Sequence, residues 1–281
     1  MSSARPLIMG ILNVTPDSFS DGGVHDRVDA AVEHAAAMIA QGADIIDVGG
    51  ESTRPGAQRI DAELEQARVL PVIRELVSMG ARVSIDTMNA STADAAASLG
   101  VDIINDVSAG VADHRMPRVA AALGLTFVAM HSRGASDARV VYTNVVADVC
   151  RDLAASVRML TAEGVDPELV VLDPGLGFAK SAVENWRLVG AIDELVALGH
   201  RVLIGASRKR FLAQMLPPSA SVSDRDLPTA IVTAMAADAG AWCVRVHDVA
   251  GSKVALDVWA AARGTAAVQT DAADRAARGA A

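Results

Sequence analysis

The chain has 281 residues, of which 51% are hydrophobic and only 3% aromatic, and its formal net charge is −9. Such a hydrophobic fraction excludes a disordered or fibrous chain, and the negative charge argues against general electrostatic binding of nucleic acid. The length suits one large domain, and no run of eighteen apolar residues predicts a membrane-spanning helix. Cys150 and Cys243 lack metal-type or disulfide-framework spacing, so we expect free thiols in a cytoplasmic protein.

Eight short runs rich in β-branched residues predict strands. Each run is apolar almost throughout, as expected for strands that are buried on both faces of a parallel sheet. In chain order they begin at Leu7, Asp44, Arg82, Asp102, Thr126, Leu169, Arg201 and Trp242.

The segments between these runs have helical periodicity. After the fifth run, an apolar stripe is formed by Val146, Val149, Leu153, Val157 and Leu160. Glycines that precede the next strand are typical of helix C-terminal caps, and they are Gly42, Gly80, Gly100, Gly124, Gly164 and Gly199. Eight alternations of strand and helix predict a single α/β domain, a parallel (β/α)₈ barrel over residues 1–263, with an Ala-rich tail at 264–281.

Polar residues follow nearly every predicted strand. The C-terminal ends of the strands are where (β/α)₈ enzymes carry their catalytic residues, so this clustering predicts an enzyme. The residues at these ends are Asn13, Gly49-Gly50-Glu51, Asp86-Thr87, Asn105-Asp106, His131, Asp173, Ser207-Arg208-Lys209, Arg245 and His247.

Three of these residues, Asp86, Asn105 and Asp173, come directly after apolar strand residues. A buried carboxylate needs hydrogen-bond donors, and a flat heterocycle such as guanine or a pterin offers adjacent N–H and NH₂ groups. The alternative is that these side chains cap helices or pair with Lys and Arg. All three together favour the heterocycle.

A cationic group lies at the same strand ends despite the net negative charge: Arg54, Lys209, Arg245 and His247. Arg and His suit an anionic substrate group such as phosphate. Ser207 precedes a predicted helix start, where free N–H groups can bind a carboxylate or phosphate, although Arg208–Arg210 can equally be a solvated helix start. We expect His131 to be a hydrogen-bonded residue at the top of the barrel.

Two long polar loops, Asn13–Gly23 and Gly49–Ala57, follow the first two strands. Their dense hydroxyl groups and Phe19 exceed what a simple connection needs, so they are candidate mobile lids over a site.

Seven motifs occur in order along the chain: MGILNVTPDSFSDGG, GGESTRPGA, SIDT, NDVS, LDPGLGF, GASRKRF and RVHDV. In these motifs the chain resembles the dihydropteroate synthases, the folate-pathway family targeted by sulfonamides, over Met9 to about Ala262. The resemblance implies a (β/α)₈ barrel, a cytoplasmic homodimer and a transferase. The implied reaction joins 6-hydroxymethyl-7,8-dihydropterin pyrophosphate to para-aminobenzoate and releases pyrophosphate.

The resemblance also implies roles for individual residues. Pterin-binding residues would be Asp86, Asn105, Asp173, Lys209, Met130, Phe178 and Arg245. The pyrophosphate would be bound by Asn13, Arg245 and His247, with Asn13 a ligand of Mg²⁺. Para-aminobenzoate would be bound by Ser207, Thr53, Arg54, Pro55 and Phe19. The catalytic residues would be Asp86, Lys209, Arg245 and Asp21.

The implied mechanism is dissociative, with Mg²⁺ and the cationic group stabilising the departing pyrophosphate and Asp86 beside the pterin cation. Two alternatives stay open. A pterin-dependent methyltransferase on the same barrel would share the ring-binding residues but have less use for the Ser207-Arg208-Lys209 motif. A non-catalytic pterin-binding paralogue would be free to lose Asn13, Arg54 or Ser207, which this chain retains.

Overall fold

The computed structural model describes residues 5–15, 24–51, 59–134 and 140–264 of the chain. Its strands are β1 (Leu7–Asn13), β2 (Ile45–Gly49), β3 (Val83–Asp86), β4 (Ile103–Asp106), β5 (Thr126–Met130), β6 (Val170–Asp173), β7 (Arg201–Ile204) and β8 (Cys243–Val246). Its α-helices are α1 (Val24–Ala40), α2 (Ala62–Ser78), α3 (Ala90–Ala97), α4 (Met116–Leu123), α5 (Val145–Ala162), α6 (Ala182–Val189), α7 (Ile192–Val196), α8 (Asp226–Asp238) and α9 (Val249–Ala262).

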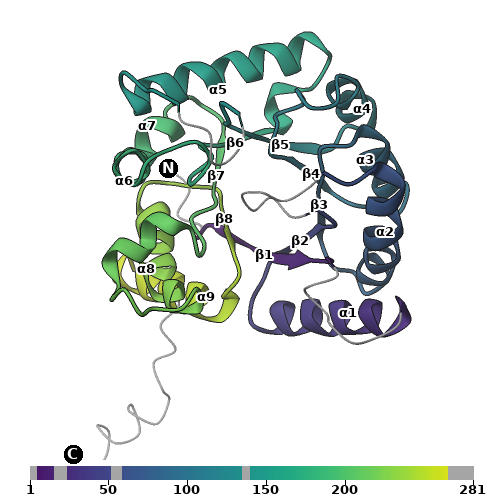
Figure 1. The fold of residues 1–281 in the computed structure, drawn as a ribbon, viewed down its shortest axis with the longest axis horizontal. Helices are drawn as coiled ribbons and strands as arrows, with labels where there is room; N and C mark the ends of the chain where they lie inside the picture. Colours follow the sequence, from purple (N-terminus) through teal and green to yellow (C-terminus); the bar gives the residue numbers. More distant parts are fainter. Residues whose placement is uncertain (1–4, 16–23, 52–58, 135–139, 265–281) are drawn as a thin grey trace, which may run out of the picture.

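The eight strands form a closed parallel barrel. Each strand pairs with the next along the chain, and β1 pairs with both β2 and β8. The strands form a ring with the helices on its outside (Figure 1). All eight predicted strands and the (β/α)₈ fold are therefore confirmed. The tail from 265 onward lies outside the described residues.

Among the described residues, three of the connections between consecutive strands contain more than one helical segment. Between β6 and β7 the chain forms two short helices, α6 and α7, separated by Gly190 and Ala191. After β7 a 3₁₀-helix, η3 (Arg210–Met215), comes before α8, and the remaining short 3₁₀ segments are η2 (Pro167–Leu169) and η4 (Ser223–Arg225).

The six glycines that precede strands adopt the backbone conformation expected of helix caps. Their φ angles lie between +62° and +107°, the left-handed region that costs glycine little and other residues more. These caps lie at the N-terminal ends of the following strands. The glycine prediction is confirmed, and so is the α5 stripe, in which Val149, Leu153 and Leu160 are buried.

The inside of the barrel is filled by one apolar layer with a single polar member. Seven strands contribute a buried residue to this layer: Met9, Ile45, Ile103, Val128, Val171, Leu203 and Cys243. The one remaining strand, β3, contributes Ser84, which is fully buried. Because side chains alternate along a strand, the residue two positions further on also points into the barrel. This parity positions the candidate site.

None of the helices in the described part of the chain is long and apolar enough to cross a membrane.

Candidate active site

The residues two positions beyond the apolar layer are mostly polar. Five of the eight are polar, namely Asp47 on β2, Asp86 on β3, Asn105 on β4, Asp173 on β6 and Arg245 on β8, and the other three are Ile11 on β1, Met130 on β5 and Gly205 just after β7. The strand alternation alone therefore brings five polar side chains together inside one ring. Asn13, at the end of β1, and His247, just after β8, lie two positions further along the same inward-facing rows.

Arg245 lies between two carboxylates near the centre of this ring. Its Nε donates to Asp47 Oδ2 at 2.6 Å, and its Nη2 donates to Asp86 Oδ2 at 2.8 Å. Asn105 Nδ2 donates to the same Oδ2 of Asp47 at 3.1 Å. Although burial acts against it, the two carboxylates raise the pKa of the Arg245 guanidinium, so Arg245 is a permanent cation here.

Asp86 has a raised pKa. Burial raises it, the Arg245 guanidinium opposes the shift, and the nearby Asp47 and Glu65 carboxylates add to it. One guanidinium thus compensates two buried carboxylates, which leaves Asp86 able to accept further N–H donors. This matches the expected need for a donor-rich ligand.

Asp173 and Lys209 form the opposite side of the ring. Asp173 Oδ1 accepts from the Gly175 N–H at 2.7 Å, and burial raises the pKa of this carboxyl against that bond and against Lys209. Burial lowers the pKa of Lys209 to about 8. The Lys209 ammonium group lies 4.2 Å from the centroid of the Phe178 ring, a cation–π contact that orients both side chains.

His247 and Ser207 are hydrogen-bonded to each other. The Ser207 hydroxyl accepts from the backbone N–H of His247 and lies 3.0 Å from Nδ1 of its ring. Burial and the neighbouring Arg245 lower the pKa of His247 to about 3, so the ring is neutral. The direction of this hydrogen bond depends on the tautomer: where the hydroxyl donates to Nδ1, the ring hydrogen is on Nε2. A neutral N–H donor of this kind suits an anionic oxygen.

The predicted position of Ser207 next to a helix start is wrong. η3 begins three residues later, at Arg210, and it is a six-residue 3₁₀-helix. Arg208, with φ of +56°, turns the chain first, and its guanidinium makes a bidentate ion pair with Asp226 on α8. Ser207 is instead fixed by His247.

The structure therefore brings together Asp86, Asn105, Met130, Asp173, Phe178, Ser207, Lys209, Arg245 and His247 around the C-terminal ends of the strands, with Asn13 at the end of β1. Phe19, Asp21, Thr53, Arg54 and Pro55 lie outside the described residues. The prediction for His131 is confirmed: it is 4% exposed and contacts Asp152 and Lys180.

Asp47 is a site residue that the sequence reasoning missed. It lies inside a predicted strand rather than at its end, and it is fully buried. The sequence feature that could have indicated a site residue was the single charged residue, two positions after Ile45, in a strand that is otherwise apolar on both faces. Lys180 was also missed; it lies after the LDPGLGF motif and contacts His131 across a large sequence separation.

Comparison with known proteins shows the family to which the chain belongs. Residues 9–247 match the family described as "Pterin binding enzyme". Dihydropteroate synthase of Mycobacterium leprae is 50% identical over 270 residues, which cover 92% of this chain and 94% of that protein. The enzyme of Bacillus subtilis is 42% identical over 87% of this chain and 84% of its own length.

Among solved structures, dihydropteroate synthase of Xanthomonas albilineans with 4-aminobenzoic acid superposes with a TM-score of 0.87 at 40% identity, covering 94% of this chain and 95% of that one. The same enzyme in complex with 7,8-dihydropteroate gives a TM-score of 0.84 at 37% identity, with the same coverage. The chain belongs to this family of pterin-binding enzymes, as a transferase of the dihydropteroate synthase group.

Proposed function

We propose that this protein is a dihydropteroate synthase, which joins 6-hydroxymethyl-7,8-dihydropterin pyrophosphate to para-aminobenzoate and releases pyrophosphate. The observation that carries the proposal is the ring formed by Asp86, Asn105, Asp173 and Arg245 inside the barrel. Its buried carboxylates and amide supply acceptors and a donor to the polar edge of one flat heterocycle. The cations beside them supply a place for an anionic group.

The pterin ring is assigned to Asp86, Asn105, Asp173 and Lys209, with Met130 and Phe178 as apolar contacts. Met130 is 4% exposed, and Phe178 is held by Lys209. Arg245 lies between this group and the pyrophosphate side. Its two ion pairs hold the guanidinium in place before the substrate binds, which is the preorganisation that favours catalysis.

The pyrophosphate is assigned to Asn13, Arg245 and His247. The described residues hold no cluster of three or more His, Cys, Asp or Glu side chains suited to a metal ion. Mg²⁺ commonly takes only one or two protein oxygens and completes its shell with phosphates and water. Asn13 fits that mode, and a bound Mg²⁺ would neutralise charge on the leaving pyrophosphate.

As the C–O bond to pyrophosphate breaks, positive charge develops on the pterin methylene group. We assign the Asp86 carboxylate to offset that charge, and the His247 ring, with its hydrogen on Nε2, to donate to the departing oxygens. The amine of para-aminobenzoate then attacks the methylene carbon to form the C–N bond, and it loses one proton to water or to the released pyrophosphate. The carboxylate of para-aminobenzoate is assigned to Ser207, which would have to exchange its hydrogen bond to His247. The loop residues Thr53, Arg54, Pro55 and Phe19 are assigned to the aminobenzoate molecule as a whole.

A homodimer in the cytoplasm is part of the same proposal. Helix α8 exposes Leu227, Ile231 and Met235, which are spaced four residues apart and therefore share one face. Val254 and Val258 are also exposed on α9, which packs against α8. An apolar face of this kind supports pairing with a second copy.

The test is an assay with purified protein, the pterin pyrophosphate, para-aminobenzoate and Mg²⁺ that follows pyrophosphate and dihydropteroate. Asp86→Asn should lower kcat/KM by about 100-fold or more, because it removes the charge beside the cation. The matched control is Asp94→Asn, an exposed carboxylate on α3. Pterin binding without product would favour the non-catalytic paralogue, and wild-type rates in Asp86→Asn would refute its role.

A further inference from the structure

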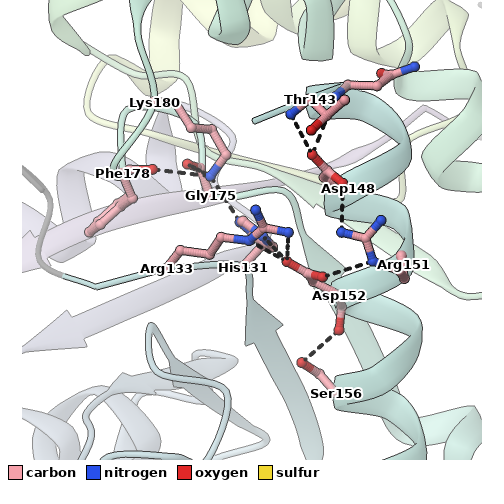
Figure 2. A network of polar contacts seen from close by, with 11 residues as sticks. His131, Arg133, Thr143, Asp148, Arg151, Asp152, Ser156, Gly175, Phe178 and Lys180 are labelled. Carbon is pink, nitrogen blue, oxygen red and sulfur yellow. Dashed lines mark hydrogen bonds and ion pairs between the residues drawn. The ribbon is translucent and has the colours of Figure 1, made fainter. Parts of the chain in front are cut away.

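Lys180 is a half-buried residue of the loop that joins β6 to α6. Its ammonium group donates to the carbonyl oxygens of Gly175 at 2.9 Å and Phe178 at 3.1 Å, and it lies 3.0 Å from Nδ1 of His131 (Figure 2). Burial lowers the pKa of Lys180 to about 7, and in its charged form the three N–H donors of the ammonium group match these three contacts. Two of the acceptors are in the β6–α6 loop and the third is at the end of β5, so one side chain joins the two elements.

The ring of His131 is fixed from both sides. When Lys180 is charged, Nδ1 accepts from it, and Nε2, which lies 3.2 Å from Asp152 Oδ2, carries the hydrogen and donates it to that oxygen. Arg133 Nε donates to the same oxygen at 2.6 Å. Burial and Lys180 lower the pKa of His131 to about 4, which keeps the ring neutral and preserves this tautomer. Figure 2 shows the chain of contacts from the loop through His131 to Asp152 on α5.

The β6–α6 loop passes directly against the end of β5. The His131 N–H donates to the Asp173 carbonyl at 2.8 Å. A Cβ on Gly175 would lie 2.0 Å from the His131 carbonyl oxygen, so only glycine allows this approach. Asp173 and Phe178 lie at the two ends of the segment 173–178. The contacts of this segment with His131 therefore determine the positions of both residues.

We propose that Lys180 is a positioning residue for the pterin pocket, which acts through His131 and the loop carbonyls to hold Asp173 and Phe178 in place. The inference rests on the proposed assignment of those two residues to the pterin ring. Lys180 donates its hydrogen bonds to the loop backbone, and its charge also stabilises the ionised Asp173 carboxylate, so it acts on Asp173 through loop position and through charge.

Lys180→Met tests this role, because methionine fills similar space but donates no hydrogen bond. We expect the Kd for 6-hydroxymethylpterin, measured by calorimetry, and the KM for the pterin substrate to rise about 10- to 100-fold, the cost typical of sub-ångström misplacement. The KM for para-aminobenzoate should change far less. The sequence has only three lysines, and Lys253, on α9 and paired with Asp257, gives the matched control Lys253→Met.

Two substitutions of His131 separate positioning from general stability. The side-chain oxygen of asparagine lies near the position of Nδ1, so His131→Asn keeps an acceptor for Lys180 and loses the contact with Asp152. Glutamine places its amide nitrogen near Nε2, so His131→Gln keeps the donor to Asp152 and loses the acceptor. We expect His131→Asn to retain pterin affinity within about threefold, and His131→Gln to lose it as Lys180→Met does.

Wild-type pterin affinity in Lys180→Met would overturn the inference and leave the proposed function intact if the enzyme still turns over. An equal loss of pterin affinity in His131→Asn and His131→Gln would also overturn the inference. Affinity that is lost whichever contact of His131 is removed indicates a merely structural role. A wild-type protein that binds 6-hydroxymethylpterin without turnover would contradict the proposed function, while the Kd values would still decide the role of Lys180. A wild-type protein that does not bind pterin would overturn both.

Discussion

Arg245 makes two ion pairs inside the barrel, and the two have different surroundings. Asp47 is fully buried, whereas the side chain of Asp86 keeps 11% of its surface exposed. The first oxygen of Asp47, Oδ1, has no hydrogen-bond partner among the described residues. Oδ2 of Asp47 is thus committed to Arg245 and Asn105, while the exposed part of Asp86 has room for a ligand. We infer that Asp47 orients the guanidinium and Asp86 faces the reaction.

Asp47→Asn should therefore impair catalysis more than folding. The amide keeps the shape but loses the charge-assisted bond to Arg245, and we expect kcat/KM to fall about 10- to 100-fold. The loss of stability should be small, because removing a buried charge also removes its desolvation cost. Steady-state kinetics and thermal unfolding measure the two effects separately.

Asp44→Asn is the matched control, because Asp44 makes a bidentate pair with Arg5 at the opposite end of the barrel. It should change the free energy of unfolding by about 1 kcal/mol and leave kcat/KM unchanged. Equal kinetic effects of the two substitutions would argue against a special role for Asp47.

Four site residues could be predicted from the sequence because each comes directly after apolar strand residues: Asp86, Asn105, Asp173 and Arg245. Strand-end position is a local property that can be read from a single segment. The roles of Asp47 and Lys180 depend on partners far away along the chain, with Asp47 separated from Arg245 by 198 residues. No local pattern encodes such a pairing until the barrel closes.

The β6–α6 loop depends on glycine for a steric reason as well as a conformational one. Gly175 and Gly124 have nearly equal φ angles, +65° and +62°. A Cβ on Gly124 would meet nothing within 4 Å, whereas on Gly175 it would collide with the His131 carbonyl. The two positions therefore separate the cost of the left-handed conformation from the cost of the collision.

Gly124→Ala should lower the free energy of unfolding by about 1 kcal/mol, the cost of a left-handed alanine, and leave activity unchanged. Gly175→Ala should cost more than this and also raise the KM for the pterin substrate, because the loop must move away from β5. Chemical denaturation and kinetics on both variants check the comparison. An equal loss of stability, with unchanged KM, would show that the loop tolerates the shift.

The strands and the glycine caps were predictable because hydrophobic pattern and backbone freedom act within a few residues. The short η3 helix and the split between α6 and α7 were not. Arg208 turns left-handed after β7 and pairs with Asp226 on α8, so that crossover is shaped by a contact across 18 residues. Tertiary contacts override local helical preference there.

Burial of neutral histidines makes the stability of the whole barrel depend on pH. The pKa of His131 is lowered to about 4 and that of His247 to about 3, both chiefly by burial, against about 6.5 in an unfolded chain. Between these values the unfolded chain binds protons that the folded chain does not. The free energy of unfolding should therefore fall as pH drops below about 6.5, by up to about 1.4 kcal/mol per pH unit for each histidine.

Denaturant unfolding of the wild type and His131→Asn between pH 7.5 and 5 tests this expectation. The variant lacks one of the two titrating rings, so its stability should fall less steeply over the same range. Parallel curves for the two proteins would mean that His131 is protonated in the folded state.

The proposed dimer face can be tested by a single charge. Ile231→Glu on α8 should convert a dimer into a monomer, since an unpaired carboxylate in an apolar interface is costly. Val111→Glu is the control, because Val111 is 76% exposed in the loop before α4. Light scattering gives the molar mass of each variant. A monomeric wild type would contradict the proposed dimer directly.

The glycine caps and the Arg5–Asp44 pair lie at one end of the barrel, and the residues of the candidate site lie at the other. Mutations that alter ligand contacts and mutations that restore lost stability therefore fall on different parts of the chain, and distant sites add almost independently. Natural selection can vary the pocket and repair the scaffold in separate steps. The two-ended construction of the barrel gives this protein an evolutionary freedom that a site built into its stabilising core would deny it.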